Sequence, residues 1–166
     1  MAVEFRDNTI KVKAAINDAT VAWLHEWASE IASQAQRNCR SGEDYSAQLR
    51  GSYADQVDES KYEAKIGTPL EAGFWEEWGT GEYAAHGDGR KGWWVYIKGQ
   101  PSKGGGKTYS TKKEAERGAR FLRSKGLDAY ATNGRKPNYT LEKAFNTNKS
   151  KAIADLKNKL KEGVGK

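Results

Sequence analysis

Apolar residues repeat at intervals of three and four between Ile16 and Ala35, and this spacing constrains the fold more than any other feature of the chain. It places one apolar stripe along a helix, so it predicts a long amphipathic helix that runs to about Arg37. Asn17 is a favourable N-cap residue and is predicted to mark the start of that helix. After Thr140 a second stripe predicts a long C-terminal helix; its members are Leu141, Ala144, Phe145, Ala152, Ile153, Leu156 and Leu160.

Short alternating patterns predict strands between these two helices. Residues 53–57 and 62–66 alternate apolar and polar side chains across a short polar turn, which predicts a β-hairpin with one half-buried face. Residues 2–13 alternate in part and predict one or two further strands. These elements predict an α+β fold in which an antiparallel sheet packs against the long N-terminal and C-terminal helices.

Residues 93–132 predict an inserted strand–helix–strand unit of βαβ-like type within a single domain of residues 1–166. Residues 93–97 are apolar on both strand faces, which predicts a central strand or a strand covered by a neighbouring subunit. Thr111 and Glu114 have the spacing of a capping box and predict the start of a helix. Gly126 is expected to end that helix before a strand at 127–132.

Aromatic residues gather around two glycines in the segment 69–84; these aromatics are Phe74, Trp75, Trp78 and Tyr83. Gly79 and Gly81 have access to positive φ, so the segment predicts a short helix that ends in a Gly-Thr-Gly loop. Phe74 and Trp78 are four residues apart and share a helix face, whereas Trp75 points partly elsewhere. At least one ring is therefore predicted to face a partner, and the alternative is that all of them anchor the core.

Charge is distributed unevenly along the chain, whose net charge is +6. Residues 1–89 hold 8 Lys/Arg and 16 Asp/Glu, whereas residues 90–166 hold 20 and 6. Such asymmetry is typical of a nucleic-acid face, of a self-complementary surface that joins copies head to tail, or of an ordinary solvated surface. If the basic half faces DNA, the best candidates are Arg90, Lys91, Arg117 and Arg120.

Residues suited to catalysis, metal binding or cofactor binding are sparse. The run 104–108 is similar to a phosphate-binding loop, but Pro101 stands where the first glycine of that motif belongs. Cys39, His25 and His86 do not have the spacing of zinc ligands. The sequence therefore predicts a non-enzymatic protein without cofactor or metal, and the alternative enzyme class is a small hydrolase that uses His86.

No apolar run reaches the roughly 20 residues needed to span a bilayer. The first residues also lack the basic-then-apolar order of a signal peptide. The sequence predicts a soluble protein without a membrane partner. Residues 90–92 and 98–107 are rich in glycine and charge, and they are expected to become ordered when a partner binds.

Three stretches resemble, in the same order, the neck proteins of tailed bacteriophages, which are also called tail-completion, head–tail joining or minor capsid proteins. That family has an N-terminal helix, then Thr-Gly-x-Leu-Arg-x-Ser, then Tyr-Ala-x-x-x-Glu-x-Gly-Thr-Gly, and a Pro-Phe-Leu-like segment that opens a C-terminal helix. The similar stretches here are residues 46–52, 72–81 and 137–141. The chain departs from the pattern at 46–47 and 72–73 and keeps it from Glu77 to Gly81.

The resemblance implies a structural subunit of the virion neck, made in the cytoplasm of the bacterial host. Such subunits form a homo-oligomeric ring, here expected to hold six or twelve copies. Its expected partners are the head-side connector or adaptor proteins, the tail tube or tail terminator protein, and the genomic DNA in the channel. Contacts are expected at Trp75, Glu77, Gly79, Thr80, Gly81, Tyr83, Trp93 and Trp94. The alternative outside this class is a basic nucleic-acid-binding module.

Overall fold

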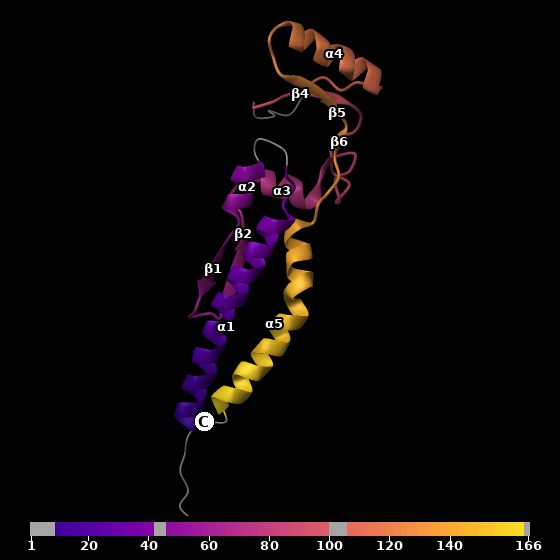
Figure 1. The fold of residues 1–166 in the computed structure, drawn as a ribbon. Helices are drawn as coiled ribbons and strands as arrows, with labels where there is room; N and C mark the ends of the chain where they lie inside the picture. Colours follow the sequence, from indigo (N-terminus) through magenta and orange to yellow (C-terminus); the bar gives the residue numbers. More distant parts are fainter. Residues whose placement is uncertain (1–8, 42–45, 100–105, 165–166) are drawn as a thin grey trace, which may run out of the picture. The chain divides into compact units, whose positions relative to one another are not determined.

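The structure is a computed structural model that describes residues 9–41, 46–99 and 106–164. It has the predicted mixed α and β fold, with long helices near both ends of the sequence and short antiparallel strand pairs between them (Figure 1). Its elements are α1 (Thr9–Asn38), α2 (Ser46–Ser52), β1 (Ala54–Asp58), β2 (Glu63–Gly67), α3 (Glu71–Trp78), β3 (Thr80–Gly81), β4 (Trp94–Ile97), α4 (Lys112–Ser124), β5 (Ala129–Thr132), β6 (Gly134–Arg135) and α5 (Thr140–Val164).

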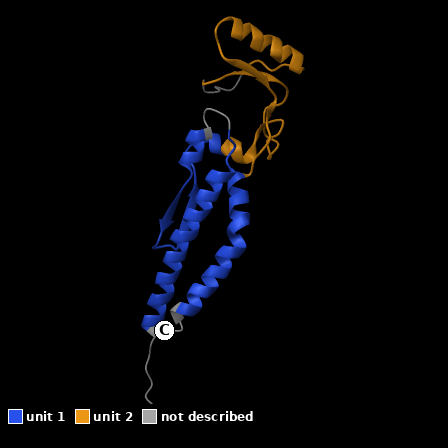
Figure 2. Cartoon of the chain, in the orientation of Figure 1, with its two compact units in different colours: residues 1–73, 140–166 blue, residues 74–139 orange. Residues whose placement is uncertain are grey.

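The chain divides into two compact units (Figure 2). Unit 1 comprises Met1–Gly73 and Thr140–Lys166, and unit 2 comprises Phe74–Tyr139. The sequence predicts one domain with an insertion at 93–132, whereas the segment that forms its own unit is longer. It also takes in most of the aromatic segment at 69–84.

In unit 1, α1 and α5 lie side by side and run in opposite directions (Figure 1). The Asn38 Nδ2 group at the end of α1 donates to the Thr140 carbonyl oxygen at the start of α5, at 3.2 Å. Further along the pair, Trp27 Nε1 donates to Asp155 Oδ2 at 2.9 Å. Both long helices of the sequence prediction are therefore present and pack against each other.

The core of unit 1 lies where the end of α1, α2 and the start of α5 meet. Leu49 of α2 is 1% exposed and is among the largest fully buried side chains. The predicted hairpin is confirmed: β1 and β2 pair antiparallel from Ala54↔Gly67 to Asp58↔Glu63, and both strands contact α1. The buried members of the core are Ile31, Ala35, Cys39, Leu49, Tyr53 and Ala144.

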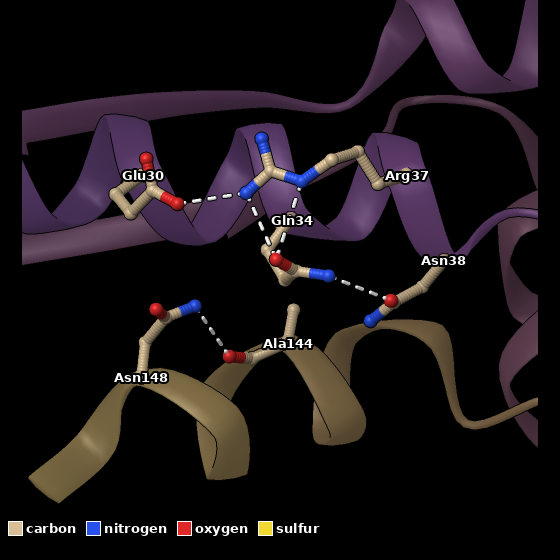
Figure 3. A network of polar contacts seen from close by, with 6 residues as sticks. All are labelled: Glu30, Gln34, Arg37, Asn38, Ala144 and Asn148. Atoms are coloured by element: carbon tan, nitrogen blue, oxygen red, sulfur yellow. Dashed lines mark hydrogen bonds and ion pairs between the residues drawn. The ribbon is translucent and has the colours of Figure 1, made fainter.

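Polar side chains also occur along the α1–α5 pair (Figure 3). On α1, Arg37 donates to Glu30 Oε1 at 2.7 Å and to Gln34 Oε1 at 2.8 Å. Glu30 and Arg37 are exposed, whereas Gln34 is half-buried and its Nε2 donates to Asn38 Oδ1 at 2.9 Å. On α5, Asn148 is buried and its Nδ2 donates to the Ala144 carbonyl oxygen at 3.0 Å. A buried amide therefore interrupts the otherwise small apolar residues on the inner face of α5.

The start of α1 corrects the sequence analysis. Strands were predicted within residues 2–13, but residues 9–13 are helical, and residues 2–8 lie outside the described part. Asn17, predicted as the N-cap, lies inside the helix. Val12 is half-buried four residues before the half-buried Ile16, so the apolar stripe continues one turn further back than expected.

The stripe predicted for α5 also needs a correction. Phe145 is 49% exposed and Ile153 is 45% exposed, although both were placed on the apolar stripe. The buried face follows Ala144, Asn148 and Ala152, which are spaced by four residues. Close packing of the two helices selects these small residues, and the larger ones lie beside the contact face.

In unit 2, β4 and β5 pair antiparallel with Trp94↔Thr132 and Ile97↔Ala129 in register, and α4 contacts both strands. The predicted order of strand, helix and strand is present, but a βαβ unit has parallel strands. Directly beyond the strand ends, Lys98 N donates to the Asp128 carbonyl oxygen at 2.7 Å, so the end of β4 lies beside the start of β5. The connection that contains α4 therefore leaves β4 and enters β5 at the same end of the strand pair, which makes the two strands antiparallel.

The predicted capping box at the start of α4 is confirmed. Thr111 Oγ1 accepts from Glu114 N at 3.3 Å, and Glu114 Oε2 accepts from Thr111 N at 3.3 Å. Ala115 and Ala119 are the buried residues of this helix. None of the helices in the described part of the chain has both the length and the apolar character needed to cross a membrane.

Candidate interaction surface

The Gly-Thr-Gly segment forms β3, which pairs with β6 in unit 2. Gly79 has φ +73° and Gly81 has φ +62°, so the predicted positive φ of both glycines is confirmed. A Cβ on Gly79 would lie 2.6 Å from the Arg135 carbonyl oxygen, and one on Gly81 would lie 2.3 Å from that of Asn133. The backbone conformation and the close approach of the opposite strand both favour glycine here.

A buried carboxylate holds the end of α3 against the segment after β6. Glu76 is 2% exposed, and its Oε1 accepts from Asn138 Nδ2 at 2.8 Å. The Arg135 guanidinium lies 3.9 Å from Glu76 Oε2, and Asn138 N donates to the Glu76 carbonyl oxygen. Glu77 is 7% exposed, so it contributes to the interior of this turn and presents little surface to a partner.

Trp78 is half-buried and packs between two other rings. Its ring centroid lies 4.7 Å from that of His86 and 6.4 Å from that of Tyr139, the latter in an edge-on arrangement. Aromatic pairs at these separations stabilise a fold beyond the apolar area that they bury. His86, the residue of the alternative hydrolase hypothesis, is thus a packing partner of Trp78.

Three large rings of the same segment are exposed: Phe74 at 58%, Trp75 at 38% and Tyr83 at 39%. Trp75 was expected to point partly away from the face of Phe74 and Trp78; it is exposed, and it lines one pocket together with both of them. Phe74 was expected to share a packed face with Trp78; the two side chains line the same pocket, but Phe74 is exposed. The helix is two turns long, and its buried positions are taken by Glu76 and Glu77.

A shallow pocket of about 230 Å³ adjoins these rings. We call it the aromatic pocket; it is lined by Phe74, Trp75, Trp78, Gly79, Thr80, Gly81, Ala84, Ala85, His86, Asp88 and Gly89. Its walls are mainly aromatic rings and backbone. Within the described residues, no group of three or more His, Cys, Asp or Glu side chains could hold a metal ion. The aromatic pocket is therefore suited to apolar contact with a side chain of a partner.

The segment at 90–92 is anchored to its own unit, although the sequence predicts few anchors for it. The Arg90 guanidinium lies 5.1 Å from the centre of the Trp94 ring and donates to Thr108 Oγ1 at 2.9 Å. Gly92 N donates to Glu82 Oε1 at 3.2 Å. Most of the second expected mobile segment, 98–107, lies outside the described residues.

The tryptophans at the start of β4 are half-buried. Trp93 forms a backbone bridge with Tyr109, and the Lys112 ammonium lies 5.9 Å from the centre of the Trp93 ring. The edge of the Trp94 ring would be 2.5 Å from a Cβ on Gly81, so Trp94 packs against the Gly-Thr-Gly segment. Both residues therefore offer a partner less surface than Phe74, Trp75 and Tyr83 do.

The residues proposed to face DNA fall into two groups. Arg117 and Arg120 are exposed on α4, whereas Arg90 is engaged with Trp94 and Thr108, and Lys91 is exposed beside it. The structure adds Lys113 to the α4 group, a residue that helical spacing from Arg117 could have identified. The exposure of Phe74 had no comparable signal, because three large aromatics compete for positions on a short helix.

Comparisons with known protein families, with curated proteins and with solved structures find no match for this chain.

Proposed function

We propose that the chain is a non-enzymatic structural subunit of a phage neck, forming a ring that joins the head connector to the tail. The observation that carries the proposal is the exposure of three aromatic side chains around the Gly79–Gly81 turn. Phe74 and Trp75 lie inside the stretch 72–81 that resembles the neck family, and Tyr83 follows it by two residues. Exposed aromatic side chains on a well-held scaffold are typical of protein interfaces. The exposed aromatic side chains thus lie beside the residues that the family pattern specifies, Glu77 and Gly79 to Gly81.

The scaffold explains why these residues suit assembly. Strand β6 and the Glu76 carboxylate hold the turn on one side, so the rings lose little conformational freedom when a partner binds. The expected partners are a second copy of the chain within the ring and the head-side and tail-side proteins beyond it. In this proposal the aromatic pocket receives an apolar side chain of a neighbouring subunit.

The test compares particles of the phage that encodes the chain, assembled with and without it. We expect unjoined DNA-filled heads and tails in its absence, seen by negative-stain electron microscopy, and rings of the purified protein under the same microscope. Joined, infectious particles that form without the chain would contradict the proposal.

The surface itself is tested with Trp75→Ala and Tyr83→Ala, which should lower the yield of rings and of joined particles. Phe121→Ala is the matched control, because Phe121 is an exposed aromatic of unit 2, at 63%, outside the aromatic segment at 69–84. If Phe121→Ala lowers the yield of ring oligomers and joined particles as much as Trp75→Ala and Tyr83→Ala do, the exposed aromatic side chains of the segment 69–84 have no special part in assembly.

A further inference from the structure

Unit 2 carries the entire net positive charge of the protein. Residues 74–139 hold 13 Lys/Arg and 7 Asp/Glu, whereas residues 1–73 and 140–166 hold 15 of each. The division into units therefore describes the charge better than the division into sequence halves. A surface that attracts a negatively charged partner is therefore expected within unit 2.

Five of the twelve described cations of unit 2 lie against aromatic rings. The charged groups of these five lie within 6 Å of a ring centre, which is the range of a cation–π contact. The pairs are Arg90 with Trp94, Lys107 with Tyr109, Lys112 with Trp93, Lys125 with Phe121, and Lys136 with Tyr83. These side chains have partners within the unit.

Helix α4 has a row of cations that differ from this group. Lys113, Arg117 and Arg120 are exposed and recur at four and three residues, so they form one ridge on the side opposite Ala115 and Ala119. At 1.5 Å per residue the ridge is about 10 Å long. Within the described residues, none of the three forms an ion pair or a ring contact.

The acidic residues of α4 do not neutralise this ridge. Glu114 belongs to the capping box, and Glu116 Oε1 pairs with Lys112 Nζ at 3.6 Å. Beside the ridge, three cations line a depression of about 450 Å³ together with one carboxylate, that of Glu116, and Tyr130; the cations are Lys112, Arg120 and Arg123. The positive charge therefore continues from the ridge into the groove between α4 and β5.

We infer that the α4 ridge, formed by Lys113, Arg117 and Arg120, binds the phosphate backbone of duplex nucleic acid. One strand of a duplex carries a phosphate about every 3.4 Å along its axis, so a ridge of about 10 Å spans about three phosphates. Arginine also matches phosphate oxygens in a bidentate manner. The ridge itself consists of cations alone, with the exposed Phe121 at its side, and a row of like charges suits a polyanion better than an apolar protein surface.

This inference does not depend on the neck proposal. The chain could form a ring in a neck without binding nucleic acid, and it could bind nucleic acid without belonging to a neck. The two proposals are therefore tested separately. The full-length purified protein is titrated against a fluorescent duplex of arbitrary sequence over a series of salt concentrations. Three phosphate contacts predict a contribution of about −2.7 to the slope of log K against log salt.

The decisive variant is Arg117→Gln with Arg120→Gln. It should reduce the magnitude of the slope by about 1.8, and at about 0.1 M salt it should weaken binding roughly 10- to 100-fold. The matched control is Lys149→Gln with Lys151→Gln, which removes the same charge from exposed positions on α5 in unit 1. The control should leave slope and affinity close to those of the wild type, and Arg117→Lys with Arg120→Lys should keep the slope.

Circular dichroism and thermal unfolding of each variant confirm that it is folded. Absence of duplex binding at low salt would overturn the inference, and so would equal losses in the α4 and α5 variants. Tighter binding of polyglutamate than of the duplex, through the same two arginines, would also overturn it and assign the ridge to an acidic protein.

Discussion

The Lys159 ammonium lies 3.1 Å from Glu26 Oε2, which joins the basic end of the sequence to its acidic first half. This contact lies within unit 1, where α5 packs against α1. The uneven charge of the sequence suggested that acidic and basic halves occupy different sides of the domain and join copies head to tail. That premise is wrong for α1 and α5, because the two helices bring opposite charges together inside one unit.

The first prediction concerns Lys159→Met, which should lower the free energy of unfolding at neutral pH. The pKa of Lys159 is raised above its ordinary value of 10.5, first by the hydrogen bond with Glu26 and then by Asp155. A raised folded pKa means that the charged form stabilises the folded state up to the unfolded pKa, and that this contribution is lost as pH rises through the folded pKa. The difference between wild type and variant should therefore shrink above about pH 10.5.

Urea unfolding followed by circular dichroism, from neutral pH to above the ordinary lysine pKa, measures this difference. Lys157→Met is the control, because Lys157 is an exposed lysine of the same helix without an ion pair in the described residues. A constant difference between Lys159→Met and wild type across the whole pH range would contradict the assignment.

The second prediction compares two glycines with the same backbone conformation. Gly79 and Gly87 both have φ +73°, so an alanine at either position costs about 1–2 kcal/mol for the left-handed backbone. A Cβ on Gly79 would lie 2.6 Å from the Arg135 carbonyl oxygen, whereas Gly87 has no neighbour within 4 Å. Gly79→Ala should therefore cost about 1–3 kcal/mol more than Gly87→Ala.

Thermal unfolding of both variants measures the two losses of stability. The cost of the left-handed backbone is common to both, so their difference reports the steric clash at Gly79. Equal destabilisation would mean that β6 moves away from the turn at little cost, and that close packing does not fix Gly79.

The parts of the fold that could be predicted from the sequence are set by local chemistry. The capping box of Thr111 and Glu114 needs residues three apart, and the hairpin of β1 and β2 follows from alternation across a short turn. The positive φ of Gly79 and Gly81 was predicted from two glycines at the end of a short helix. In each case the signal lies within a few residues, so no knowledge of distant partners is required.

Long-range packing decides the features that were predicted wrongly. Whether Phe145 or Ala144 lies against α1 depends on how closely the helices approach, and the stripe contains both. The antiparallel pairing of β4 and β5 depends on where the connection through α4 returns. For the candidate site, the exposure of Trp75 followed from helical geometry, whereas the attachment of Arg90 to Trp94 depends on a loop conformation that local residues do not specify.

The third prediction is that Asn148→Leu stabilises unit 1 by about 1 kcal/mol. Asn148 is 5% exposed, and its amide donates to the carbonyl oxygen of Ala144 in its own helix. Replacing a buried polar group by an apolar one of similar size is often neutral or stabilising, because burial no longer requires the amide to lose its water.

Urea unfolding measures this gain. Asn146→Leu, at an exposed position of the same helix, should change the free energy of unfolding by less than about 0.5 kcal/mol. Destabilisation by Asn148→Leu would show that the site lacks room for the branched side chain or that the amide has a structural role in joining the helices.

The last prediction separates stability from assembly within the aromatic segment. Trp78 is half-buried against His86 and Tyr139, so Trp78→Ala should cost about 2–3 kcal/mol, somewhat less than the truncation of a fully buried ring. Trp75 is 38% exposed, so Trp75→Ala should change the free energy of unfolding by less than about 1 kcal/mol.

In assembly, by contrast, Trp75→Ala is the variant expected to impair ring formation of the folded subunit. An aromatic side chain buried at the centre of a protein interface contributes about 2 kcal/mol or more to binding. Trp75→Ala should therefore lower the fraction of protein in ring oligomers, measured at a protein concentration where the wild type is only partly assembled. Urea unfolding of the isolated subunit and mass measurement of the assembled protein are made on the same samples. If Trp75→Ala and Trp78→Ala destabilise the subunit equally, Trp75 is a core residue and its exposed face has no partner role. If Trp75→Ala leaves both stability and ring formation unchanged, the partner surface lies elsewhere, and Tyr83 and Phe74 become the residues to test.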